Sequence, residues 1–376
     1  MFKFFDSGLC PIGIDVGSHA VRMVQFRAGA GGLSLQAACR IEIDSLGATA
    51  SGALGGARAA IAVEHGLANR EFSGRRVVLS LPAANVHAKS VRLPQMPDSD
   101  LNQALQWEAK DRFGFEVGES GTGGQLVWFR VGEVRRGTEV KDELLLFAVE
   151  GSLLTDYIQA LSAMKIEVAA VDIAPCAIDR GIRRTLTSGS PVTGSGAVLD
   201  IGHAGSQFFI TCGGELVFYK YIDMGARTIH EAVAAKLGIT VGEAIQMRAR
   251  LIGGAGTEAA MSADDAAPLG QALHDAMRSP LEELARELDM CMRYYVVTFR
   301  GARPESVLLT GRQASCLHTR EILSTALGLQ VEEAQPLRGV QNLGDAARPD
   351  RSGEWAVDAG LSLYPMGTRA LAEAAA

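Results

Sequence analysis

The sequence predicts an α/β protein made of two duplicated domains that flank a cleft, because one pattern of apolar runs and turns occurs twice. The first copy starts at "IGIDVG" (Ile12–Gly17) and the second at "AVLDIG" (Ala197–Gly202). In both copies an apolar strand ends at an Asp-x-Gly turn, and a strand, a glycine-rich hairpin, a third strand and a helix-like stretch follow. A unit that is repeated once at long distance indicates duplicated domains rather than a short-period solenoid.

Length and composition agree with two folded domains. The 376 residues exceed one ordinary hydrophobic core, and 47% hydrophobic with 21% charged residues is typical of a well-packed globular protein. A net charge of -7 argues against nucleic-acid binding, and no apolar run approaches the length of about 18 residues that spans a membrane. The cysteines and histidines show no zinc or disulfide spacing, and no Ser-His-Asp or G-x-S-x-G pattern indicates a hydrolase.

The two acidic turns predict a phosphate site. Asp15 and Asp200 hold equivalent places in the two copies, and a glycine follows each at the second position. Small residues let backbone N–H groups form a concave anion site, and a carboxylate beside it can hold a hydrated divalent cation. The alternative is two unrelated turns in which each Asp only accepts local hydrogen bonds. Two copies in matching positions favour the phosphate cleft.

Helices are also signalled by the residues alone. Leu101, Leu105, Ala109 and Phe113 recur at every fourth position and predict one apolar helix face. Ser279 and Pro280, with Glu282 as a capping-box partner, predict the N-terminus of a second helix. We expect the first of these helices to belong to an insertion in the first domain.

Several ordered motifs give the chain a family resemblance. "GIDVGSHAVRMV" (Gly13–Val24), "VLDIGHAGSQFFI" (Val198–Ile210) and "VLLTGR" (Val307–Arg312) resemble the two phosphate motifs and the adenosine motif of the actin-like ATPase superfamily. Within it the chain most resembles the PilM family of type IV pilus assembly, through Val77–Glu119, "VAAVDIAPCAIDRGI" and "GEWAVDAGLSLYPM". The resemblance covers nearly the whole chain, and it extends more weakly to the division protein FtsA and to type II secretion L proteins.

The resemblance implies an actin-like ATPase fold, with two duplicated domains flanking a nucleotide cleft and an inserted α+β subdomain. The expected domains are residues 1–183 with the insertion at about 83–143, residues 184–353, and a C-terminal helix at 354–376 that returns to the first domain. ATP would lie between the domains, with Mg2+ held by Asp15 and Asp200. The residues expected to bind the nucleotide are Gly17, Ser18, Arg22, Gly202, His203, Gly205, Ser206, Gly225, Glu243, Gln246, Gly311 and Arg312.

Some positions depart from the family pattern, and they bear on catalysis. After the first Asp-x-Gly turn the family usually has several serines and a lysine, whereas this chain has His19, Ala20 and Arg22. Two positions where a second glycine is usual carry Ala226 and Arg312, and Gln246 replaces a usual lysine. The sequence identifies no general base for hydrolysis. We therefore expect ATP binding that is weak or absent and, at most, a slow ATPase.

The resemblance implies a cytoplasmic scaffold of a type IV pilus or a related type II secretion system. Its expected partners are the N-terminal tail of a PilN-like inner-membrane protein, docked between the first domain and the insertion, and other inner-membrane pilus assembly proteins. The chain would reach the membrane only through these partners. The alternatives are an FtsA-like filament-forming division protein and an actin-fold small-molecule kinase. The ending "TRALAEAAA" lacks the basic amphipathic helix of the former, and no acceptor site is identifiable for the latter.

Overall fold

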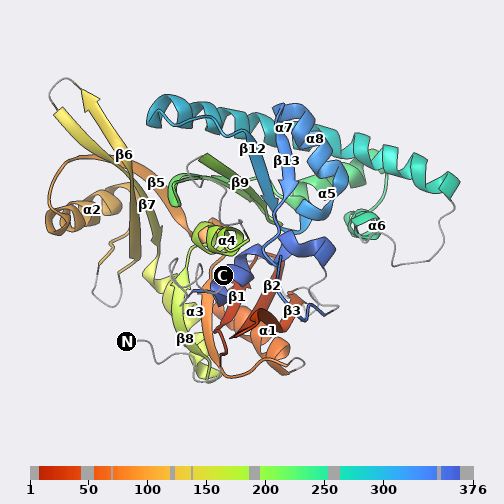
Figure 1. Ribbon diagram of the computed structural model, residues 1–376, viewed down its shortest axis with the longest axis horizontal. Coiled ribbons are helices and arrows are strands. Elements are labelled where there is room, and N and C mark those ends of the chain that lie inside the picture. Colours follow the sequence, from red (N-terminus) through yellow and green to blue (C-terminus); the bar gives the residue numbers. More distant parts are fainter. Residues whose placement is uncertain are drawn as a thin grey trace.

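In the part of the chain that the structure describes there are three β-sheets, and two of them have equivalent strand orders (Figure 1). The structure, a computed structural model, describes residues 8–43, 55–68, 71–118, 123–136, 139–185, 195–252, 263–344 and 349–364. The first sheet consists of β1 (Ile12–Val16), β2 (Ala20–Gly29), β3 (Gly32–Glu42), β4 (Arg76–Ser80) and β8 (Glu167–Asp172). The second sheet consists of β9 (Ser195–Ile201), β10 (Ser206–Cys212), β11 (Glu215–Ile222), β12 (Ser306–Thr310) and β13 (Gln330–Glu333).

The strand orders of these two sheets are equivalent. They are β3-β2-β1-β4-β8 in the first sheet and β11-β10-β9-β12-β13 in the second. In each, the central strand pairs antiparallel with the strand that follows it and parallel with its other neighbour. The repeated order confirms the duplicated α/β architecture that the sequence predicts.

Helices cover both faces of the first sheet. On one face, α1 (Gly56–Ala68) and α3 (Gly151–Ala163) share a buried apolar cluster with β1 and β4. On the other face, α4 (Ala174–Arg183) packs against α9 (Ala356–Ser362), and α9 contacts β1. A Cβ atom at Gly13 would lie 2.2 Å from the carbonyl oxygen of Asp358, so only glycine permits this approach. The chain thus returns to the first sheet behind the Asp15 turn, while residues 365–376 of the expected C-terminal helix lie outside the described residues.

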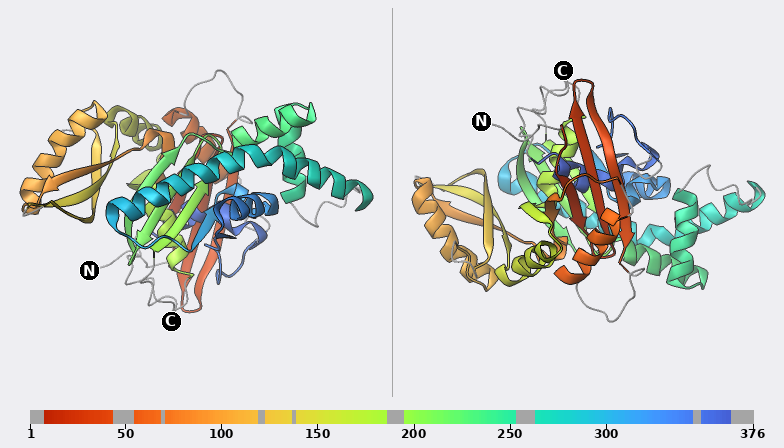
Figure 2. Two further views of the ribbon diagram at one scale, coloured as in Figure 1. Left: turned by 90° about the horizontal axis from the view of Figure 1, so that it is seen from above. Right: turned by 90° about the horizontal axis from the view of Figure 1, so that it is seen from below.

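Four helices belong to the second sheet: α5 (Ala226–Leu237), α6 (Val241–Ile252), α7 (Ala263–Phe299) and α8 (Leu317–Leu327). The long α7 runs across the strands of this sheet (Figure 2, left). The prediction that a helix begins at Ser279 is wrong, because α7 is continuous through Pro280. Leu273 and Met277 extend its buried face into the same core as Leu281, and this packing outweighs the backbone hydrogen bond that an interior proline forfeits.

The remaining sheet forms the insertion, with order β5-β7-β6: β5 (His87–Pro94), β6 (Gln125–Arg136) and β7 (Glu139–Val149). One face is covered by α2 (Asp98–Phe113), whose Leu101 and Leu105 pack with Leu144. The other face contacts the second sheet, where the rings of Phe147 and Tyr219 lie 4.9 Å apart. The insertion projects at the opposite end of the molecule from α6 (Figure 2). Short 3-10 turns occur at Ala83–Asn85, Arg312–Ser315 and Pro349–Trp355.

Candidate functional site

The two Asp-x-Gly turns have the same backbone geometry. Asp15 lies near the carboxyl end of β1 and Asp200 near that of β9. In the first turn the Gly17 N–H donates to the Ala20 carbonyl oxygen at 3.0 Å. In the second turn the Gly202 N–H donates to the Gly205 carbonyl oxygen, also at 3.0 Å. The duplication seen in the strand order therefore extends to the hydrogen bond that closes each turn.

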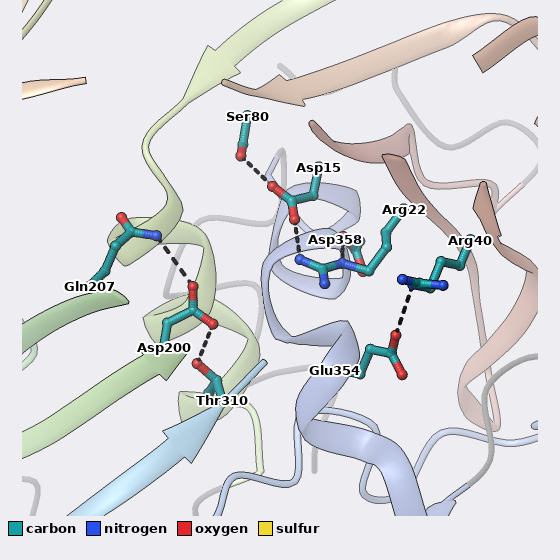
Figure 3. Close-up of polar contacts among 9 residues, drawn as sticks. All are labelled: Asp15, Arg22, Arg40, Ser80, Asp200, Gln207, Thr310, Glu354 and Asp358. Atoms are coloured by element: carbon teal, nitrogen blue, oxygen red, sulfur yellow. Dashed lines mark hydrogen bonds and ion pairs between the residues drawn. The ribbon is translucent and has the colours of Figure 1, made fainter. Parts of the chain in front are cut away.

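Each turn carboxylate accepts a hydrogen bond from a hydroxyl group on the parallel neighbouring strand. Ser80 is the register partner of Asp15, and its Oγ donates to Asp15 Oδ1 at 2.8 Å. Thr310 is the register partner of Asp200, and its Oγ1 donates to Asp200 Oδ1 at 3.0 Å. Both acids are buried at the floor of the cleft, and these hydroxyl groups fix their orientation (Figure 3).

On the antiparallel side the two copies differ. Asp15 is the register partner of Arg22, and the guanidinium forms an ion pair with Asp15 Oδ2. The Nε atom of Arg22 also lies 3.6 Å from Asp358 Oδ1, so the guanidinium stands between two carboxylates (Figure 3). Asp200 is instead the register partner of Gln207, whose Nε2 donates to Asp200 Oδ2 at 3.3 Å. One acid is thus neutralised by a cation and the other is held by a neutral amide.

This difference shapes the electrostatics of the cleft floor. Burial alone would lower the pKa of Arg22, but the carboxylates of Asp15 and Asp358 raise it above its ordinary value. Burial raises the pKa of Asp358, although the Arg22 charge opposes the rise. Burial likewise raises the pKa of Asp200, against the opposing charge of Arg22. The fixed positive charge of Arg22 therefore acts on all three acids.

A cavity lies between the two turns. It has a volume of about 150 Å³. His19 of the first turn and His203 of the second both line it, and their rings stack with centroids 4.4 Å apart and an interplanar angle of 17°. The sequence-predicted residues that line the cavity are Asp15, Gly17, Ser18, Arg22, Asp200, Gly202, His203, Gly205 and Arg312.

The other predicted residues do not line the cavity. Ser206 is buried and donates its hydroxyl hydrogen to the Met224 carbonyl oxygen at 2.6 Å. Gly225 and Gly311 pack under the second turn: a Cβ atom would lie 2.5 Å from the carbonyl oxygens of His203 and Ile201, respectively. Glu243 accepts the Thr240 N–H at 2.8 Å, where it caps α6, and Gln246 is exposed on the same helix. Their roles at a ribose stay predictions.

Sequence reasoning missed a buried arginine in this cavity. Arg248 is 2% exposed, bonds His230 Nδ1 at 3.0 Å and also donates to Gln313. It has no carboxylate partner among the described residues, and its Nε–H has no hydrogen-bond partner there. Because arginine only donates, the Nδ1 of His230 accepts and its imidazole is neutral. Arg248, Ile245 and Ala249 form the face of α6 that lines the cavity.

A pair of oppositely charged residues at the cavity was also missed. Arg40 on β3 and Glu354, just before α9, both line it, and Arg40 Nε lies 3.3 Å from Glu354 Oε1 (Figure 3). The only local signal for Glu354 is its place in "GEWAVDAGLSLYPM", and nothing near Arg40 in the sequence points to the cleft.

The residues at Asp15 do not fit the Mg2+ ion that an acidic turn predicts. Both oxygens of Asp15 and both of Asp200 already have a side-chain partner. Within the described part of the chain, no group of three or more His, Cys, Asp or Glu side chains is arranged to hold a metal ion. The positive charge beside Asp15 is the guanidinium of Arg22, which forms an ion pair with Asp15 Oδ2.

Two acids, one at the end of β8 and one on α4, form ion pairs away from the cavity. Asp172 forms an ion pair with Arg180 at 2.8 Å, and Asp179 forms one with Arg183. Neither acid lines the cavity.

None of the helices that the structure describes combines the length and the apolar composition needed to span a membrane.

Comparison with known proteins identifies the family of this chain. The family described as type IV pilus assembly protein PilM matches residues 13–363. The chain belongs to this family. No curated protein matches the chain.

Solved structures agree on the fold. One described as "PilM-PilN type IV pilus biogenesis complex" is 19% identical, covers 94% of this chain and 98% of its own, and superposes with a TM-score of 0.72. The ethanolamine utilization protein EutJ from Carboxydothermus hydrogenoformans is 12% identical and superposes with a TM-score of 0.53. The match covers 95% of this chain and 90% of EutJ. The actin-like ATPase fold expected from the resemblance to the PilM family is confirmed.

Proposed function

We propose that this PilM-family chain is a scaffold of pilus assembly that binds an adenine nucleotide in its cleft and the N-terminal tail of a PilN-like inner-membrane protein. The observation that carries the nucleotide part is the convergence of two turns with the same backbone geometry on one cavity. A phosphate chain needs anion-binding backbone from both sides, and a duplicated turn supplies it. The chain would be cytoplasmic and peripheral to the inner membrane through its partners.

The nucleotide has a preferred orientation in this proposal. Its phosphoryl groups lie on the Gly17–Ser18 and Gly202–Ser206 turns, and its adenosine lies toward Arg312 and α6. Gly311 supports this arrangement, because its φ of 80° and its close approach to Ile201 exclude a side chain beneath the adenosine motif. Glu243 and Gln246 would meet the ribose after a shift of α6 toward the ligand.

Calorimetric titration of the full chain with ATP tests this orientation. Gln246→Lys restores the family lysine and adds a positive charge near the ligand, so we expect it to tighten ATP binding by up to about tenfold. Gln103→Lys on α2 is the matched control, because it adds the same charge at an exposed position of the insertion. Equal affinities for the two lysine variants would contradict the orientation.

The partner tail is proposed to add to the edge of the inserted sheet. β5 is an edge strand of that sheet, pairing with β7 on one side. Its first residue, His87, lies beside Phe113 and Phe115, with ring centroids 6.1 Å and 5.6 Å away, where the insertion joins the first domain. An extended peptide can form main-chain hydrogen bonds along such an edge and place alternate side chains in pockets. A solved relative described as a PilM-PilN complex supports the kind of partner.

N-methylated peptides test the docking mode on the intact chain. In a strand-to-strand contact only every second N–H group of the tail bonds the edge of β5. We therefore expect one alternating set of N-methyl groups to abolish binding of the synthetic tail and the complementary set to leave it nearly unchanged. Equal effects of both sets, or no binding by the unmodified tail, would rule out addition to the β5 edge.

A further inference from the structure

The first turn of the cleft carries its own cation. Arg22 forms an ion pair with Asp15, and Asp358 of α9 lies behind the same guanidinium. The equivalent position of the second copy is Gln207, so the duplicated architecture does not itself require a positive charge there. Figure 3 shows the asymmetry directly, with Arg22 between two carboxylates and Gln207 beside Asp200 alone.

An acidic turn normally opposes phosphate binding. Two negative groups repel each other in a cleft of low dielectric, and a divalent ion between them removes the repulsion. In this chain the guanidinium already neutralises Asp15. A divalent ion at Asp15 would have to displace Arg22 or stand against its charge, and the buried Asp358 holds Arg22 in place.

The rest of the cavity is not acidic. Its charged lining residues are four arginines (Arg22, Arg40, Arg248 and Arg312) and three carboxylates (Asp15, Asp200 and Glu354). Arg248 has no carboxylate partner among the described residues, which leaves positive charge for a ligand anion. A guanidinium keeps its charge at every accessible pH and donates hydrogen bonds in a geometry that suits phosphate.

We propose that Arg22 takes the place of the divalent cation, so that the cleft binds the phosphoryl groups of its nucleotide without metal. The proposal rests on the proposed function, because it concerns the same cleft and the same ligand. It differs from the sequence-based expectation, in which Asp15 and Asp200 hold Mg2+.

The test is calorimetric titration of the full chain with ATP, once in EDTA and once in excess Mg2+. We expect ATP to bind at least as tightly in EDTA as in excess Mg2+, since the cleft has no site for the metal and Mg2+ bound to ATP in solution competes with Arg22 for the same phosphoryl groups. An affinity at least about tenfold higher in Mg2+ would overturn the inference and leave the proposed nucleotide site intact. Absence of ATP binding under both conditions would overturn the inference and the nucleotide site together.

Variants of Arg22 make the test specific to the guanidinium. Arg22→Gln copies the residue of the second copy, so we expect ATP binding in EDTA to weaken by about tenfold or more and Mg2+ to restore it. Arg22→Lys keeps the charge and should still bind ATP in EDTA at least as tightly as in excess Mg2+. Circular dichroism and the unfolding midpoint establish whether each variant is folded. If Arg22→Gln does not fold, the titrations of the wild-type chain in EDTA and in Mg2+ still test the inference. Metal-independent binding by folded Arg22→Gln at wild-type affinity would contradict the role of Arg22.

Discussion

Asp15 on β1 stands directly opposite Arg22 on β2, and the guanidinium of Arg22 holds the carboxylate at the floor of the cleft. At the same register of the second copy, Asp200 stands opposite Gln207. The two turns are therefore alike in backbone and different in charge. Since the cleft combines one neutralised acid with one amide-held acid, its two halves offer a ligand different electrostatic environments.

Gly311 is expected to be irreplaceable for steric reasons. Its φ is 80°, and a Cβ atom would lie 2.5 Å from the Ile201 carbonyl oxygen and 3.1 Å from Asp200 Oδ1. Gly311→Ala should lower the free energy of unfolding by more than about 2 kcal/mol, through left-handed strain plus the clash. Gly328→Ala is the matched control, because Gly328 has a φ of 63° with nothing near its Cβ position, and strain alone should cost about 1 kcal/mol. Equal losses in urea unfolding would contradict the steric account.

His230 is expected to destabilise the protein in mild acid. Burial, with a smaller contribution from the Arg248 charge, lowers the pKa of His230 to about 3. Between about pH 6.5 and 3 the unfolded chain binds a proton at this residue that the folded chain does not, so stability falls as the pH drops.

His230→Gln should remove that part of the pH dependence. Measured by urea unfolding, the wild-type chain should lose about 1.4 kcal/mol more than the variant between pH 8 and 5.5. Other titrating groups are common to both proteins and cancel in the difference. Parallel pH profiles of the two proteins would show that His230 titrates normally in the folded state.

Turnover of ATP is expected to be slow or absent. Asp172 and Asp179 are engaged in ion pairs outside the cavity. Of the acids that line it, Asp15 and Asp200 are held by the side chains of Ser80, Arg22, Thr310 and Gln207, and Glu354 forms an ion pair with Arg40. Phosphate release by the isolated chain should stay below the roughly 1 per second at which the range of typical enzymes begins. Release at several per second without partners would contradict this and revive the interpretation as a kinase-like enzyme.

The sequence predicted the parts of this site that are local. The duplicated turns could be recognised because the strand, the acid and the glycine follow one another in each copy. Ser80 and Thr310 could not be identified in this way, since their hydroxyl groups reach the acids from strands 65 and 110 residues away.

The sequence also could not predict which residues tertiary packing brings to the cleft. The sequence places Arg22 among the nucleotide-binding residues, but nothing near it shows that Asp358, at the other end of the chain, lies behind its guanidinium. On α6 the family pattern pointed to Glu243 and Gln246, whereas the rotation of the helix turns Ile245, Arg248 and Ala249 into the cavity. Ala244 and Arg248 are both buried and lie four residues apart on one helix face, but a charged residue at that spacing does not indicate a buried position in the sequence.

Hydrogen exchange of the full chain with and without ATP tests the central claim most directly, because a ligand held by both copies must protect both turns at once. The account predicts slower exchange in the peptides that contain Gly17–Ala20 and Gly202–Gly205, together with the segment around Gly311. Protection of only one turn, or protection confined to other parts of the chain, would contradict a nucleotide bound between the duplicated halves.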